Sequence, residues 1–177
     1  VETQVGDQLA APTHSGVVEF DNDSYKEADT VVITLTDADL NVNPDIINIY
    51  TVVTSADDDA MDMVGKANYG VNSVGDPNAR LLDVTFDDEL WLKSTATAGA
   101  GKATCSSTPA GGDGLGGSGF TLVETGKNTG VFTGDFQVPA EYCARSSGSG
   151  VVSSVMGTDI EVNYVDYRDA SGEIIEV

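Results

Sequence analysis

Five side chains that carry oxygen recur at every second position after residues 30–36, which alternate as in a half-buried β-strand. They are Asp37, Asp39, Asn41, Asn43 and Asp45. Carboxylates crowded at one strand end repel one another unless a positive charge lies between them. Ca²⁺ takes about six to eight oxygen ligands from carboxylates, amides and carbonyls. The spacing therefore predicts a Ca²⁺ site in which Asp37 and Asp39 supply carboxylates and Asn41 or Asn43 supplies an amide oxygen.

Further ligands for such an ion would come from a neighbouring loop, where Asp166 and Asp169 are the candidates. The pattern is not an EF-hand, because Val42 stands where that loop needs its glycine and Asn48 where it needs its bidentate glutamate. An alternative explains the same residues without a metal, since aspartate and asparagine favour turns and bond to their own backbone. The sequence leaves both interpretations open.

The excess of acidic over basic residues limits which kinds of molecule the protein is expected to bind. The chain of 177 residues has 29 acidic and 8 basic residues, which gives a formal charge of −21 at pH 7. A nucleic-acid or anionic-lipid partner needs a basic surface, so this balance argues against both. It favours divalent cations or a salty medium, because unscreened repulsion of this size destabilises a compact state. No run of about 18 apolar residues exists, so we expect no membrane-spanning helix.

Three features of the sequence indicate an extracellular or cell-surface location. Cys105 and Cys143 both lie in segments rich in serine and glycine, which favours one disulfide formed in an oxidising compartment. Asn22 opens an Asn-Asp-Ser sequon for N-glycosylation. The chain begins at Val1 with no signal peptide, which we interpret as the processed form of an exported protein.

The sequence offers little of the usual catalytic chemistry. His14 is the one histidine, so zinc, copper and a serine or cysteine nucleophile all lack their usual partners. A glycosidase needs two carboxylates, but its cleft is hard to build in a small sandwich with few aromatic residues. We therefore expect a protein that is not an enzyme.

Strand patterns separated by turn signals run through the chain, and no helical pattern is convincing. The predicted strands are residues 16–21, 30–36, 46–55, 82–86, 120–138 as a hairpin, 160–164 and 173–177. About seven to nine strands of this kind are typical of an all-β sandwich or barrel. We expect both faces of the apolar segment 46–55 to be covered, and the Ser- and Gly-rich segment 141–157 to be irregular. Residues 15–177 are predicted to form one domain with a long insertion at 56–119.

Residues 1–14 precede the first clear strand. In an extended conformation Val1, Thr3, Val5, Asp7 and Leu9 fall on one face, with mostly polar residues on the other. This alternation predicts a strand given to a neighbouring subunit, where it would pair with an exposed sheet edge by β-strand addition. A flexible leader is the alternative, because chain termini are usually loose.

Two segments are VEFDNDSYKEADTVVITLTDADLN at residues 18–41 and LVETGKNTGVFTGDFQV at residues 122–138. They resemble immunoglobulin-like modules of archaeal surface-layer proteins and of extracellular filament or adhesion proteins. The resemblance implies an immunoglobulin-like fold, export and a structural role at the cell surface, often with Ca²⁺. This chain departs from the family in its long segment 56–119 and in holding one module rather than an array. A lone module with an extended leader fits a polymerising subunit.

The sequence therefore predicts a Ca²⁺-stabilised structural subunit of a pilus-like filament or a surface layer, whose partners are copies of itself. A Ca²⁺-dependent carbohydrate-binding or adhesion module is the alternative, with glycans as partners. Such modules display aromatic side chains on which sugars stack. The candidates for that role are Trp91, Tyr50, Tyr69, Tyr142 and Tyr167.

Overall fold

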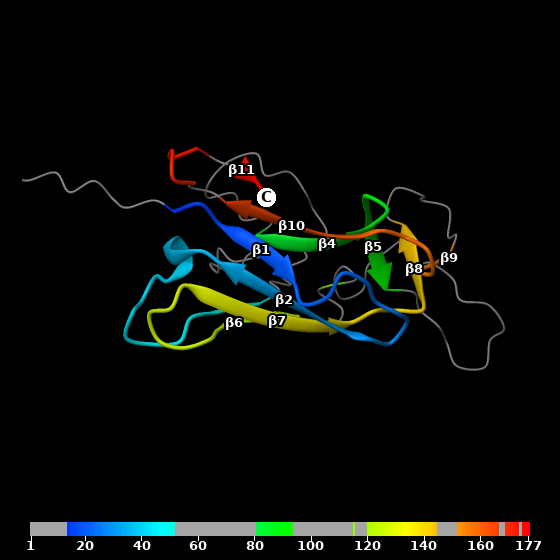
Figure 1. Cartoon of the computed structure of the whole chain (residues 1–177), viewed down its shortest axis with the longest axis horizontal. Helices are drawn as coiled ribbons and strands as arrows, with labels where there is room; N and C mark the ends of the chain where they lie inside the picture. The colour runs from blue at the N-terminus through cyan, green and yellow to red at the C-terminus, as the bar shows by residue number, and fades with distance from the viewer. Residues whose placement is uncertain are drawn as a thin grey trace, which may run out of the picture.

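The computed structural model describes residues 14–51, 81–93, 115, 120–144, 152–166, 169–173 and 175–177. Strands dominate these residues and form two antiparallel sheets that pack into a sandwich (Figure 1). Within the described residues, no helix is long and apolar enough to cross a membrane. The prediction of an all-β sandwich is confirmed.

The first sheet has the strand order β1-β2-β7-β6-β3. Its strands are β1 (Val17–Phe20), β2 (Thr30–Thr36), β3 (Ile49–Thr51), β6 (Thr121–Glu124) and β7 (Val131–Gln137). A short 3₁₀ helix, η1 (Ala38–Leu40), follows β2. Along the whole length of β2 and β7 the strands are paired, from Thr30 opposite Gln137 to Thr36 opposite Val131.

The second sheet has the order β11-β10-β4-β5-β8-β9. Its strands are β4 (Leu82–Phe86), β5 (Glu89–Lys93), β8 (Glu141–Ala144), β9 (Val152–Ser154), β10 (Ile160–Asp166) and β11 (Ile175–Glu176). Asp87 and Asp88 join β4 to β5 and both have positive φ, as a two-residue type I′ hairpin turn requires. β10 also lies against β1 of the first sheet.

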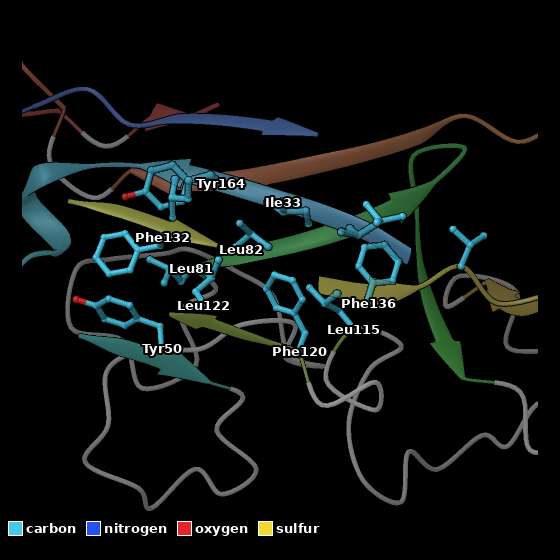
Figure 2. Packing of buried hydrophobic residues seen from close by; sticks show 14 of the residues in the cluster. Ile33, Tyr50, Leu81, Leu82, Leu115, Phe120, Leu122, Phe132, Phe136 and Tyr164 are labelled. Carbon is cyan, nitrogen blue, oxygen red and sulfur yellow. The ribbon is translucent and has the colours of Figure 1, made fainter. Parts of the chain in front are cut away.

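The core lies between the two sheets and follows from the two-residue period of the strands (Figure 2). Its fully buried members include Val31, Ile33, Leu35, Leu82, Phe86, Leu122, Phe132 and Tyr164. Burying one such side chain stabilises the fold by about 1.5–3 kcal/mol. Gly134 lets β7 approach the Phe120 ring, because a Cβ at this position would lie 2.6 Å from its Cζ atom.

Two expectations about local structure are wrong. In residues 46–51, the described part of segment 46–55, one face is open: β3 begins at Ile49, and Ile46, Ile47 and Ile49 are 52%, 46% and 60% exposed. The reason is position, because β3 is the last described strand on its side of the sheet. Segment 141–157, which the sequence suggested to be a loop, holds two strands: β8, whose four residues include no serine or glycine, pairs with β5 on one side and with β9 on the other.

Candidate functional site

Buried acids gather at the end of the sandwich where β2 and β10 end and β7 begins. We call this end the hairpin pole, because the β6–β7 turn (residues 125–130) lies there (Figure 1). It holds two groups of interacting side chains. The Asp37 corner consists of Asp37, Asp39, Asp166 and Tyr164, and the Glu124 network consists of Glu124, Asn48, Asn41, Thr129 and Gly130.

Asp37 occupies the N-cap position of η1. Its side chain is 2% exposed, and its Oδ1 accepts a 2.8 Å hydrogen bond from the backbone N–H of Asp39. The Tyr164 hydroxyl donates a hydrogen bond to Oδ2. The local sequence explains the placement, because aspartate is among the preferred N-cap residues and satisfies a free amide of the following turn.

Asp166 reaches the same corner from the end of β10. It is 1% exposed, and its Oδ2 accepts a 2.8 Å hydrogen bond from the Gly16 amide. A side chain on Gly16 would overlap the Tyr164 ring, so a glycine is needed where the chain passes this point. Thus the structure brings together Asp37 and Asp166, which the sequence predicted to meet although 129 positions separate them.

Burial and like charge oppose ionisation of Asp37. Burial raises the pKa of Asp37, and the neighbouring charges of Asp166 and Asp39 raise it further; the hydrogen bonds from Tyr164 and the Asp39 amide offset part of this rise. Burial, together with the bond to Asp37, also raises the pKa of Tyr164, which therefore stays a proton donor. A proton or a cation would relieve the repulsion between these carboxylates.

Asp39 holds the start of the described chain. Its Oδ2 accepts a 3.0 Å hydrogen bond from the His14 amide, and its Oδ1 lies 3.1 Å from Nδ1 of the His14 ring. The hydroxyl of Ser15 accepts a 3.3 Å bond from the amide of Ala170. Residues 14–16 are therefore tied to the sandwich at the Asp37 corner, and this fixes the point at which residues 1–13 join it.

The other predicted ligands have local bonding partners. Asn43 Oδ1 accepts a 3.0 Å bond from the Asp45 amide, as in an Asx turn. Asp169 Oδ1 accepts bonds of 2.9 and 2.7 Å from the amide and hydroxyl of Ser171 and one of 2.8 Å from the Glu173 amide. The Ser171 hydroxyl bond, with those backbone bonds, lowers the pKa of Asp169. For these side chains the turn-forming interpretation describes the contacts seen.

The Glu124 network is a site that sequence reasoning missed. Glu124 is 2% exposed, and its Oε2 accepts bonds of 3.0 and 2.8 Å from the backbone and side-chain nitrogens of Asn48. Its Oε1 accepts bonds of 2.8 and 3.0 Å from the amides of Thr129 and Gly130. Asn48 also donates a 3.0 Å bond to Asn41 Oδ1, so the Asn41 amide oxygen belongs to this network. A signal was present, because Glu124 shares the buried face of β6 with Leu122.

The Glu124 carboxylate is ionised although it is buried. Burial raises its pKa, but the bonds from the Asn48 backbone and side chain and from the amides of Gly130 and Thr129 lower it more, to about 2 against an ordinary value of 4.5. The carboxylate therefore fastens the β6–β7 turn to the segment before β3. The role of Glu124 is therefore structural, since all its described hydrogen bonds are to other residues of the chain.

The structure brings only some of the predicted metal ligands together. Across the described ranges, no three histidine, cysteine, aspartate or glutamate side chains form a group that could hold a metal ion. Among the predicted ligands, Asp37 and Asp166 lie close enough for the charge of Asp166 to act on Asp37. A cation at the Asp37 corner would be held by these two carboxylates together with water.

The structure describes some of the remaining predicted residues and not others. Asn22 is exposed, and its side-chain amide donates a 2.8 Å bond to Asp21. Tyr50 and Tyr142 are 4% and 5% exposed, so neither offers a platform for a sugar. The leader residues Val1, Thr3, Val5 and Leu9 lie outside the described residues, as do Cys105, Tyr69, Tyr167 and the side chains of Cys143 and Trp91. The Cys105–Cys143 disulfide stays a prediction.

No protein-family model and no curated protein matches this chain. The immunoglobulin-like subclass suggested by the resemblance therefore stays a prediction beyond the observed all-β sandwich. What the chain does has to be argued from its own side chains, edges and charges.

The Glu124 network predicts a specific dependence of stability on pH. Because the folded-state pKa of Glu124 lies below its unfolded value, the stabilisation is complete above about pH 4.5 and is lost as the pH falls toward about 2. Replacing the carboxylate in Glu124→Gln should lower the urea midpoint at pH 7 and flatten the fall in midpoint between pH 4.5 and pH 2. Urea titrations followed by circular dichroism at several pH values measure both effects.

Glu141→Gln is the matched control, because Glu141 is exposed on β8 and should leave the midpoint nearly unchanged. If the wild-type protein and Glu124→Gln lose stability in parallel between pH 4.5 and pH 2, then Glu124 does not carry the stabilisation assigned to it.

Proposed function

We propose that this protein is a structural subunit of an extracellular assembly, a pilus-like filament or a surface layer, in which copies join by β-strand addition. The observation that carries the proposal is the apolar surface at the β3 edge of the first sheet. Ile49 and Val123 are cross-strand neighbours and are 60% and 38% exposed. Exposed apolar side chains at a sheet edge are unfavourable in an isolated molecule and useful where another strand is added.

The leader supplies a strand of suitable character. Residues 1–9 are predicted to alternate, with Val1, Thr3, Val5, Asp7 and Leu9 on one face. The bonds of His14 to Asp39 and of Gly16 to Asp166 tie the base of this leader to the sandwich. This base would hold a donated strand to the sandwich of its own subunit.

Ca²⁺ belongs to the same proposal as a stabilising ion. The charge of −21 and the like charges that raise the pKa of Asp37 both favour a bound cation at the Asp37 corner. Ca²⁺ would supply positive charge there and relieve the repulsion between Asp37 and Asp166. The cell-surface location, the immunoglobulin-like subclass and the absence of catalysis complete the proposal, and they rest on the sequence arguments given above.

Deleting residues 1–13 should separate folding from assembly. The truncated chain keeps His14 and the bonds that tie residues 14–16, so we expect a folded monomer where the full chain forms filaments or sheets. Size-exclusion chromatography with light scattering, and electron microscopy in the presence of Ca²⁺, measure the difference. The apolar face of the leader is expected to pack against the next copy. The double substitution Val5→Asp with Leu9→Asp should therefore prevent assembly, as the deletion does.

Glu2→Gln is the matched control for that experiment, since it changes the opposite face of the leader without adding charge and should assemble normally. Truncated chains that polymerise as readily as the full chain would show that the leader does not join the subunits.

Replacing Asp37 tests the cation. With a chelator at pH 7, Asp37→Asn should melt no lower than the wild-type protein, because the raised pKa of Asp37 means that its charge costs stability above that pKa. Millimolar Ca²⁺ should raise the melting temperature of the wild-type protein and leave that of Asp37→Asn nearly unchanged. A hundredfold excess of Ca²⁺ over its Kd corresponds to about 2.7 kcal/mol of added free energy of unfolding. Differential scanning calorimetry in low salt measures both.

Asp135→Asn is the matched control for the cation, because Asp135 is exposed on β7 and away from the corner. Equal melting temperatures of the wild-type protein in chelator and in Ca²⁺ would show that Ca²⁺ does not stabilise the fold.

A further inference from the structure

A groove of about 790 Å³ lies at the pole of the sandwich opposite the hairpin pole. It opens between the β1–β2 loop and the loop that leads into β10, and Phe86, Val138, Val155 and Ile160 give it an apolar lining. At its mouth Met156 is 80% exposed. A volume of this size is within the range of about 300–1,000 Å³ that is usual for binding pockets.

Carboxylates outnumber bases around this groove. Asp23, Glu27, Asp159 and Glu161 line it, against the single base Lys26. A hydrogen bond with Asp88 and the charges of Asp88 and Asp159, together with some burial, raise the pKa of Glu161. Negative charge is therefore concentrated here beside an apolar lining, and the groove favours a partner that is both apolar and positively charged.

The hairpin pole of the same protein presents exposed apolar side chains and one exposed base. Val42, Ile46 and Ile47 are exposed in the segment between η1 and β3, by 76%, 52% and 46%. Beside them Lys127 is exposed in the β6–β7 turn. A 2.7 Å hydrogen bond from Asn41 Nδ2 to Asn128 Oδ1 joins the segment to the turn, so the apolar side chains and the ammonium group belong to one surface.

This surface is held in shape before any partner arrives. The Glu124 carboxylate binds the amides of Thr129 and Gly130 on one side and Asn48 on the other. The turn is further fixed by a 2.8 Å bond from the Thr125 amide to the Val131 carbonyl. A preorganised surface loses less conformational entropy on binding, which strengthens association.

The two surfaces lie at opposite ends of one strand. Lys127 precedes β7 and Val138 follows it, and the strand between them has seven residues. At about 3.4 Å per residue they are roughly 24 Å apart, so one copy cannot satisfy both surfaces by itself. A contact between different patches on two copies repeats at every subunit and produces an open chain or a ring.

We propose that the hairpin pole of one copy docks into the groove of the next copy, with Lys127 against the acidic rim and Val42, Ile46 and Ile47 against the apolar lining. The contact rests on the proposed function, because it concerns the same assembly, and it gives that assembly a second, head-to-tail interface besides the leader. Asp45, the exposed carboxylate of the docking segment, is available to Lys26 of the groove.

A charge exchange tests the contact. Lys127→Glu and Glu161→Lys should each raise the concentration needed for assembly about tenfold or more, because each places like charges in the interface. The two changes combined in one chain should restore assembly toward the wild-type concentration. Glu19→Lys is the matched control, since Glu19 is exposed on β1 and does not line the groove; sedimentation and electron microscopy at graded concentrations give the readout.

Cross-linking of the wild-type assembly gives a measurement that needs no variant. A zero-length carbodiimide should join Lys127 of one copy to Asp159, Glu161, Asp23 or Glu27 of another, identified by mass spectrometry of mixed isotopically labelled chains. Assemblies without this cross-link, single variants that assemble normally, or a combined variant that stays impaired would overturn the docking and leave the leader contact standing. Wild-type chains that remain monomeric at all concentrations would overturn the proposed function and the docking together.

Discussion

Hydrogen bonds to buried carboxylates hold the hairpin pole together. Asp37, Glu124 and Asp166 are each at most 2% exposed, and a buried carboxylate is tolerated when donors surround it. Gly130 connects two of these acids: its amide donates to Glu124, and its carbonyl accepts a 2.8 Å bond from the Asp37 amide. With φ at +62° and Ala38 close to it, Gly130 occupies a position that a side chain would disrupt.

This arrangement makes one end of the sandwich rigid, and rigidity fits a building unit. The Asp37 corner ties residues 14–16 to the sandwich, and the Glu124 network shapes the β6–β7 turn. Both devices use the acidic residues in which the chain is rich, so part of the charge of −21 has a structural use within the molecule. The remaining acids include those around the groove, where a basic and apolar surface would complement them.

The sequence predicted the sandwich because its strands alternate, as β2 does with Val31, Ile33 and Leu35 facing the core. It also offered Asp166, from a loop expected to lie nearby, as a further ligand beside Asp37, and the structure places Asp166 close enough for its charge to act on Asp37. It could not separate a metal ligand from a turn former, because Asn43 and Asp169 use the same side-chain oxygens for either purpose. The exposure of Ile49 could not be predicted from the sequence, since the hydrophobic pattern alone does not say which strand lies at the edge of a sheet.

Carboxyl ¹³C NMR titration of the protein labelled at aspartate and glutamate tests the central claim most directly. The account predicts that Glu124 titrates with a midpoint at about 2, far below its ordinary value of 4.5, and that Asp37 titrates above its ordinary value of 3.8. Both carboxyl groups titrating at their ordinary values would contradict it, because neither group would then have the buried, hydrogen-bonded surroundings on which the hairpin pole depends.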